Sequence, residues 1–239
     1  MKALTTAVIE SLDIGEGTAV SLSPTGKYTA ILAKDKNRDI IDIYELQDSA
    51  FIFHSTFKIP VGYAIDEGMI TWSPDENILA FSNEKAEEYV HDSSIFIYDI
   101  SNRLLTNLTD PGEDFVQYMG DEGVYIIDSL PCFSEDSKSL YFSRRSVNGN
   151  WLCSIDINGD NITHLFEPAN GRYIDYKIIQ RGEKIYFSVA GHEKNDLWGL
   201  YVYEEGSGAQ RLKFEYDDRY YNLALKDITA DGQYLLYYL

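Results

Sequence analysis

The sequence has too few cysteines for a disulfide scaffold and no apolar run that could cross a membrane. Its 239 residues include only Cys132 and Cys153, and neither belongs to a CxxC motif or a Cys/His cluster of the zinc-binding kind. Glu10 and Asp13 interrupt the short apolar N-terminal run, which does not resemble a signal peptide. We therefore expect a cytoplasmic protein without membrane insertion. A chain that starts after a removed signal peptide would be periplasmic or secreted.

Basic residues are also scarce. Lysine and arginine total 20 against 39 acidic residues, which gives a formal net charge of −19. Such a chain repels phosphate backbones, so we expect no nucleic-acid partner. Residues 84–136 hold thirteen acids against Lys85 and Arg103, a net charge of −11 in this stretch. This excess predicts a protein partner with a basic surface; the alternative interpretation is a solvated acidic surface.

A sustained helical period is absent, and strand signals take its place. Aromatic residues make up 14% of the chain, with 19 tyrosines, which favours strands. A phrase of apolar strand, polar turn and apolar strand recurs five times, at 20–32, 70–82, 131–143, 178–188 and 227–238. A third and a fourth strand follow each of the first four copies, and the turns are about 45 to 61 residues apart.

This pattern predicts an all-β protein, a β-propeller of four-stranded antiparallel blades with about five blades. A sandwich of irregular hairpins is the rival all-β interpretation. The predicted units are approximately 14–58, 59–108, 109–166, 167–214 and 215–239 in one domain. In unit three a strand separates Cys132 from Cys153, so we expect both to be free thiols.

The turn phrase resembles the TolB-like propeller repeat, over about four-fifths of the chain. The residues that carry the resemblance are Ser23-Pro24-Thr25-Gly26-Lys27, Trp72-Ser73-Pro74-Asp75 with Ala80-Phe81-Ser82, and Ala230-Asp231-Gly232. The Trp-Asp and Gly-His signatures of the WD40-like repeat are missing. The resemblance implies a propeller, usually with six blades, and specifies no activity, since this repeat occurs in periplasmic scaffolds and in propellers attached to enzymes.

Unit five contains only two predicted strands, so the ring needs another element to close. We expect residues 3–13 to add an outer strand to this last blade, because a propeller closes to remove its sheet edges. The alternative is a truncated six-bladed ring.

Long, varied connections leave one face of the predicted propeller, and this face is the candidate binding surface. We place Arg144 and Arg145 in one of these loops. The candidate binding residues are Glu87, Glu88, Tyr89, His91, Glu113, Asp114, Tyr118, Arg144, Arg145, Arg172, Tyr173, His192 and Tyr220.

Motifs for metal or nucleophile chemistry are weak. Asp156 to Asn161 with Glu167 partly fits a calcium loop, but Asn158-Gly159 is a hairpin turn signal. Gly206-Ser207-Gly208 lacks the spacing of a nucleophile elbow, and the four histidines form no i, i+4 metal pair. We predict no catalytic residue, no metal and no cofactor.

Three functional hypotheses follow. The first is a non-enzymatic scaffold that binds a protein through the acidic, tyrosine-rich loop face. The second is a sugar- or anion-binding propeller, which could be an enzyme, with Arg144, Arg145, Arg172, His91 and His192 converging at the channel mouth. The third is a propeller fragment of a larger protein.

Overall fold

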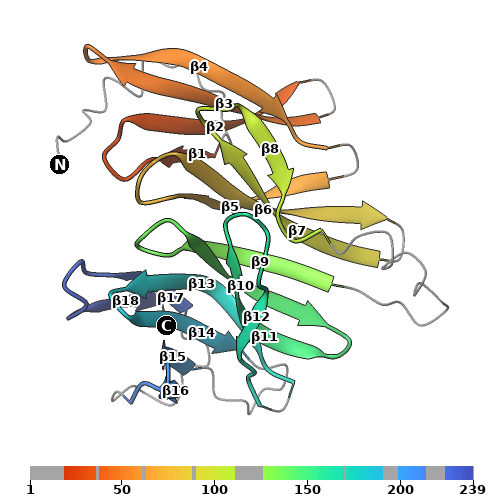
Figure 1. The fold of residues 1–239 in the computed structure, drawn as a ribbon, viewed down its shortest axis with the longest axis vertical. Coiled ribbons are helices and arrows are strands. Elements are labelled where there is room, and N and C mark those ends of the chain that lie inside the picture. The colour runs from red at the N-terminus through yellow and green to blue at the C-terminus, as the bar shows by residue number, and fades with distance from the viewer. Residues whose placement is uncertain are drawn as a thin grey trace.

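The computed structural model describes residues 19–35, 38–60, 63–87, 90–110, 126–169, 171–190, 199–213 and 224–238. Within these ranges every regular element is a β-strand, and no helix is long and apolar enough to span a membrane. The strands fall into five consecutive units, which follow one another through the molecule in Figure 1. The predicted all-β class is therefore confirmed.

The first four units are antiparallel meanders of four strands, each strand paired with its neighbour in the chain. Unit one consists of β1 (Val20–Leu22), β2 (Tyr28–Asp35), β3 (Arg38–Gln47) and β4 (Ala50–Lys58). Unit two consists of β5 (Tyr63–Trp72), β6 (Ile78–Glu87), β7 (Val90–Asp99) and β8 (Leu104–Asn107). Unit three consists of β9 (Ile126–Phe133), β10 (Ser139–Ser146), β11 (Gly149–Asp156) and β12 (Thr163–Phe166). Unit four consists of β13 (Tyr173–Arg181), β14 (Lys184–Ala190), β15 (Gly199–Glu204) and β16 (Gly208–Arg211). Among the described residues, unit five is the pair β17 (Ala224–Ile228) and β18 (Leu235–Tyr238).

The units pack face to face, and a separate apolar cluster fills each seam. Alternate residues of one strand serve different seams. In β6, Leu79 and Phe81 belong to the cluster shared with unit one, whereas Ala80 belongs to the cluster shared with unit three. A strand buried on both faces needs a continuous apolar run, which is why Ile95 to Tyr98 has no polar residue. Four-stranded meanders stacked in this way form a β-propeller, as predicted.

The first strand of each unit lies on the inside. The inner strands of adjacent units contact one another in order: β1 contacts β5, β5 contacts β9, β9 contacts β13, and β13 contacts β17. Units two and three are also joined directly, because Ser93 of β7 pairs in parallel with Ile127 of β9. The Ser93 hydroxyl donates a hydrogen bond to the carbonyl oxygen of Asp128 at 2.8 Å.

The repeated turn phrase has one structure in units one, two, three and five. Its first residue is a serine or threonine whose backbone amide donates to the carbonyl five residues later, and whose side-chain oxygen accepts from that later amide. The fourth residue has a positive φ angle, at Gly26 (77°), Glu76 (60°), Ser137 (61°) and Gly232 (70°). Glycine is favoured there because it has no Cβ to oppose this conformation.

Three connections differ from the sequence prediction. Arg144 and Arg145 lie inside β10, so their placement in a loop was wrong. Residues 63–67 lie in β5, and β6 and β7 pair as far as Glu87 and Val90. Polar residues suggested loops here, but paired strands extend beyond the apolar core and keep polar side chains at their ends. The predicted closing strand, residues 3–13, lies outside the described residues.

Candidate functional site

A cavity of about 760 Å³ lies among the inner strands, on the side of the first-to-second-strand turns. Its walls come from β5, β9, β13 and β17 and from turns of units one, two and three. The lining residues are Pro24, Ile70, Thr71, Trp72, Pro74, Leu130, Pro131, Cys132, Phe133, Glu135, Tyr176, Lys177, Ile178, Ile179, Gln180, Arg181, Leu225, Lys226 and Asp227. The volume is within the range of about 300–1,000 Å³ that is typical of ligand sites.

All four of these inner strands have an irregular pairing register close to the cavity. In β9 the pairing register with β10 shifts opposite Phe142. In β13 the register shifts between Asp175 and Ile178, and in β17 it shifts at Lys226. The shift in β5 is larger. A bulge adds a residue that the neighbouring strand does not match, and it redirects the side chains around it. Consecutive residues of β13, Tyr176 and Lys177, consequently both line the cavity.

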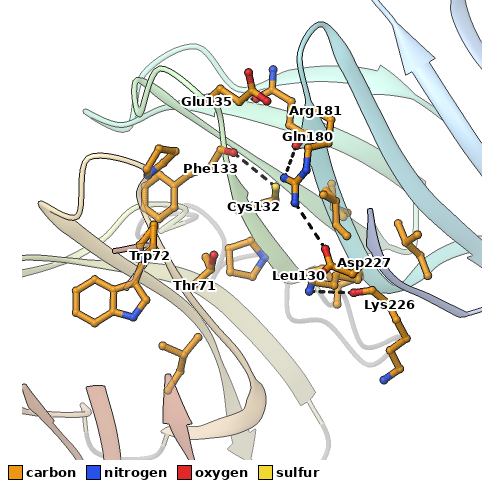
Figure 2. A pocket seen from close by; sticks show the side chains of 18 of the residues that line it. Thr71, Trp72, Leu130, Cys132, Phe133, Glu135, Gln180, Arg181, Lys226 and Asp227 are labelled. Carbon is orange, nitrogen blue, oxygen red and sulfur yellow. Dashed lines mark hydrogen bonds and ion pairs between the residues drawn. The ribbon is translucent and has the colours of Figure 1, made fainter. Parts of the chain in front are cut away.

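Polar groups on the cavity wall tie units three, four and five together. The Glu135 amide donates to Gln180 Oε1 at 2.8 Å, and the Gly182 amide donates to Glu135 Oε1 at 2.8 Å. Arg181 donates to the carbonyl oxygen of Ile228 at 3.3 Å, and its Nη2 lies 3.6 Å from Asp227 Oδ1. Figure 2 shows Arg181 directed toward Asp227. These groups therefore have a structural role at the seams.

Lys177 crosses from β13 to the bulge of β17. Its Nζ donates to the carbonyl oxygen of Lys226 at 3.1 Å. The Lys226 side chain extends away from the Arg181–Asp227 pair in Figure 2. At this part of the cavity wall a backbone carbonyl oxygen, rather than a carboxylate, accepts the hydrogen bond of Lys177.

Cys132 is half-buried in the cavity wall, on β9. Burial raises the pKa of its thiol to about 11, against the opposing influence of a backbone hydrogen bond from Gln180 and of nearby basic residues. The thiol is therefore protonated at neutral pH and is a poor nucleophile.

The predicted arginines lie at the opposite ends of these strands and have separate roles. Arg144 Nε and Nη2 donate to the two oxygens of Asp128, both at 2.7 Å, and Asp128 is fully buried. Arg145 instead stacks over the ring of Tyr173, with 4.1 Å between the guanidinium carbon and the ring centroid. The structure thus brings Arg145 and Tyr173 together, and it occupies Arg144 with an internal ion pair.

Arg172 lies beside this pair at the start of β13. The side-chain amide of Asn150 donates to the carbonyl oxygens of Gly171 and Arg172, at 3.3 and 2.9 Å. These two hydrogen bonds hold the start of β13 against β11. The predicted hairpin turn at Asp156 to Asn161 is also confirmed, with the Gly159 amide donating to the Asp156 carbonyl oxygen at 2.9 Å.

The other predicted site residues are not among the side chains that the structure describes. Glu87 and His91 belong to β6 and β7, but the structure does not describe their side chains. The remaining candidates lie outside the described residues: Glu88, Tyr89, Glu113, Asp114, Tyr118, His192 and Tyr220. In the part of the chain that the structure describes, no group of three or more His, Cys, Asp or Glu residues could hold a metal ion.

Sequence reasoning missed the cavity, although two signals for it exist. Pro131 lies inside an inner strand, and proline within a strand is typical of an edge or a bulge. In β13 the alternation of apolar residues breaks, because Ile174 is followed by Ile178 and Ile179. Both irregularities mark bulges.

Comparisons with solved structures show a TolB-like β-propeller fold. No family model and no curated protein matches the chain. It is similar to TolB from Acinetobacter baumannii, with a TM-score of 0.55, 15% identity, and coverage of 90% of this chain and 46% of that one. A putative TolB from Agrobacterium tumefaciens has a TM-score of 0.53 and 17% identity, with coverage of 81% of this chain and 63% of that one. Oligogalacturonate lyase from Vibrio parahaemolyticus has a TM-score of 0.61 and 11% identity, with coverage of 92% of this chain and 58% of that one. The chain thus spans roughly half of the length of these proteins.

Proposed function

We propose that this protein is a non-enzymatic β-propeller that binds an extended segment of a partner protein in the cavity among its inner strands. The cavity itself is the observation that carries the proposal. It lies where four inner strands converge, and its volume of about 760 Å³ suits a short stretch of polypeptide or a ligand of that size.

The inner strands favour a polypeptide over a compact ligand. In the described part of the chain, β5, β13 and β17 stand at the ends of their sheets, so each has an inner edge without a paired strand. Such edges carry backbone amides and carbonyls that an extended peptide can bind, while alternate side chains enter apolar recesses. Ile70, Leu130 and Ile179 supply apolar wall.

The acidic, tyrosine-rich loop face stays our prediction for a second contact, with a basic partner surface. A second candidate function, binding of a sugar or small anion at the loop side, is favoured by the stacked pair Arg145 and Tyr173. Cytoplasmic location likewise stays a prediction from the sequence.

A peptide library displayed on phage tests the proposal. We expect selection against the wild-type protein to yield peptides whose binding is lost in Thr71→Trp, because Thr71 lines the cavity and the larger ring fills it. Thr56→Trp is the matched control, since Thr56 is exposed on the outer strand β4. Circular dichroism and thermal melting establish that both variants are folded.

A second measurement locates the bound peptide without a substitution. Hydrogen–deuterium exchange should slow in β5, β13 and β17 when the peptide is added, because its strand covers their inner edges. Peptides that bind Thr71→Trp as well as wild type and slow no exchange in these strands would overturn the cavity as the binding site.

A further inference from the structure

We infer that Asn148 is a site of spontaneous deamidation, at which the backbone nitrogen of Gly149 displaces the side-chain amide and leaves aspartate or isoaspartate. Asn148 lies at the tip of the hairpin that joins β10 to β11, and it does not line the cavity. The inference therefore goes beyond the proposed function and does not depend on it.

Asparagine followed by glycine is the pair in which this reaction meets the least steric hindrance, because glycine has no side chain beside the attacking nitrogen. The chain contains three such pairs, Asn148-Gly149, Asn158-Gly159 and Asn170-Gly171. Asn170 lies outside the described residues, so the structure compares the first two. These two pairs have the same covalent chemistry and differ only in their surroundings.

The side chain of Asn148 is exposed. The strands β10 and β11 pair as far as Ser146 and Gly149, which leaves Val147 and Asn148 as a two-residue connection. The backbone amide of Asn148 donates to Ser146 Oγ at 3.0 Å, but none of the described residues forms a hydrogen bond with its carboxamide. The carboxamide is therefore able to rotate until its Cγ approaches the nitrogen of Gly149.

Packing explains why glycine follows Asn148. A Cβ atom at Gly149 would lie 2.6 Å from Cζ2 of Trp151 and 2.9 Å from Oε1 of Glu167, which is closer than non-bonded atoms approach. The Trp151 ring also stacks on His164, with 4.6 Å between the ring centroids, and packs against the apolar cluster between units two and three. The glycine that this packing requires is thus the residue that leaves Asn148 open to attack.

The reaction needs only water and hydroxide. The backbone nitrogen of Gly149 gives its proton to hydroxide and forms a bond to Cγ of Asn148. The bond from Cγ to Nδ2 breaks, and the leaving nitrogen takes a proton from water and departs as ammonia. The product is a cyclic succinimide. Water then hydrolyses either of its carbonyl–nitrogen bonds and gives aspartate or isoaspartate, so a carboxylate replaces a neutral amide.

Asn158 also precedes a glycine, but hydrogen bonds hold it in its turn. Its Nδ2 donates to Asp160 Oδ2 at 2.9 Å, and its Oδ1 accepts from the Asp160 amide at 3.2 Å. The nitrogen of Gly159, which would be the nucleophile, donates to the Asp156 carbonyl oxygen at 2.9 Å. These bonds must open before the attack, and the nearby Asp160 charge opposes ionisation of the Gly159 amide. The structure therefore protects Asn158.

Isoaspartate at the hairpin tip affects the packing of Trp151. This product adds a carbon atom to the main chain between the Cα atoms of residues 148 and 149. Gly149 is then displaced at a position that has no spare room beside Trp151. We expect the modified protein to melt at a lower temperature and to show altered tryptophan fluorescence.

Peptide mapping by mass spectrometry, after incubation of the intact protein at pH 8, tests the inference. We expect Asn158 to deamidate about tenfold more slowly than Asn148, because its turn must open first. In concentrated urea both turns are lost, so the two rates should become similar. Asp160→Ala removes the exposed side-chain acceptor of Asn158 and should speed deamidation of Asn158 alone.

The Asn148→Asp variant separates the added charge from the added carbon. It carries the same charge as the modified protein on an unaltered main chain, so it should melt with the wild type. The isoaspartate fraction, separated by ion-exchange chromatography, should melt below both. Equal melting of the isoaspartate fraction and Asn148→Asp would overturn the predicted effect on Trp151.

The rates in the folded protein decide the inference itself. Equal rates at Asn148 and Asn158, or a faster reaction at Asn158, would overturn it. An Asn148 that reacts in urea but not in the folded protein would also overturn it, because the hairpin would then protect this side chain. None of these outcomes affects the cavity, whose peptide binding is measured separately.

Discussion

Arg144 and Arg145 are neighbours in the sequence, yet the alternation of β10 gives them different tasks. Arg144 faces unit two and holds the buried carboxylate of Asp128, whereas Arg145 faces unit four and stacks on Tyr173. Burial raises the pKa of Asp128, against the hydrogen bonds and charge of Arg144, which favour the ionised form. The Asp128 charge thus depends on its partner.

Arg144→Met should lower the free energy of unfolding at pH 7 by about 3–5 kcal/mol, because it leaves a buried charge without a partner. Arg145→Met, the control, should change it by less than about 1 kcal/mol. A carboxyl whose pKa is raised in the folded state binds protons more tightly there, so the stability of Arg144→Met should recover from pH 7 toward pH 5. Urea unfolding at the two pH values measures this. Equal losses in both variants, or a pH-independent loss, would contradict it.

Tyr176 adopts a left-handed backbone conformation at the bulge of β13. Glycine adopts this conformation without strain, whereas alanine does not, so Tyr176→Gly should be more stable than Tyr176→Ala by about 1 kcal/mol. Both variants lose the phenol, so the difference between their melting temperatures measures the effect of the backbone conformation alone. Equal melting temperatures would show that the backbone relaxes when the side chain is removed.

The two cysteines are free, as the sequence predicted. Cys132 pairs with Tyr141 and Cys153 pairs with Phe142, so the thiols lie on opposite sides of β10 and on opposite faces of the blade. Burial raises the pKa of Cys153 to about 12. At pH 8 an aromatic disulfide reagent should therefore react slowly with the folded protein and find two thiols after denaturation. Rapid reaction of two thiols in the folded protein would contradict this burial.

At the scale of elements, the repeated turns also connect neighbouring units. The Thr25 amide and hydroxyl donate to the Glu76 carboxylate, at 2.6 and 2.8 Å to Oε1, and the Asp75 amide donates to Ser137 Oγ at 3.2 Å. The contacts of Glu135 with the turn of unit four continue the series. One turn thus contacts the next around the rim of the channel.

Glu76→Gln should destabilise the protein by about 1–2 kcal/mol at pH 7, because hydrogen bonds to a charged acceptor are stronger than neutral ones. Burial opposes ionisation of Glu76, but the hydrogen bonds from Thr25 and Ser23 prevail and lower its pKa from the ordinary 4.5. This stabilisation is complete above pH 4.5 and is lost as the pH falls through the lower folded pKa. The difference between wild type and variant should accordingly shrink between pH 6 and pH 3 in urea titrations. Glu183→Gln, in the exposed turn of unit four, is the control, and a difference that persists at pH 3 would contradict the role of the charge.

Strands and turns were predictable from the sequence because they depend on local pattern. Apolar runs such as Ile95 to Tyr98 need burial on both faces, and the Ser-Pro-Asp phrase forms its own hydrogen bonds. The cavity depends on where separate strands bulge relative to one another, which no single segment encodes. Arg144 was misplaced for a related reason, since its burial within a strand depends on the carboxylate of Asp128 on the adjacent strand.

At the scale of the whole molecule, unit five differs from the others. Its described part has two strands, and β18 pairs with β17 alone among the described elements. Leu236 of β18 is 64% exposed, and the nearby Tyr234 is 69% exposed. An apolar strand at the end of a sheet readily pairs with other chains. A further strand on this edge would extend the blade and cover the exposed edge of β18.

Residues 3–13 are our predicted source of that strand. Deleting them should lower the melting temperature by several degrees and promote association, because the apolar edge of β18 is left open. Calorimetry and size-exclusion chromatography at several concentrations measure the two effects. Thr5→Ser with Thr6→Ser, which keeps the segment and its backbone donors, should match the wild type in both assays. A deletion variant that stays monomeric with an unchanged melting temperature would show that these residues add no strand, and that the edge of β18 is protected by other means.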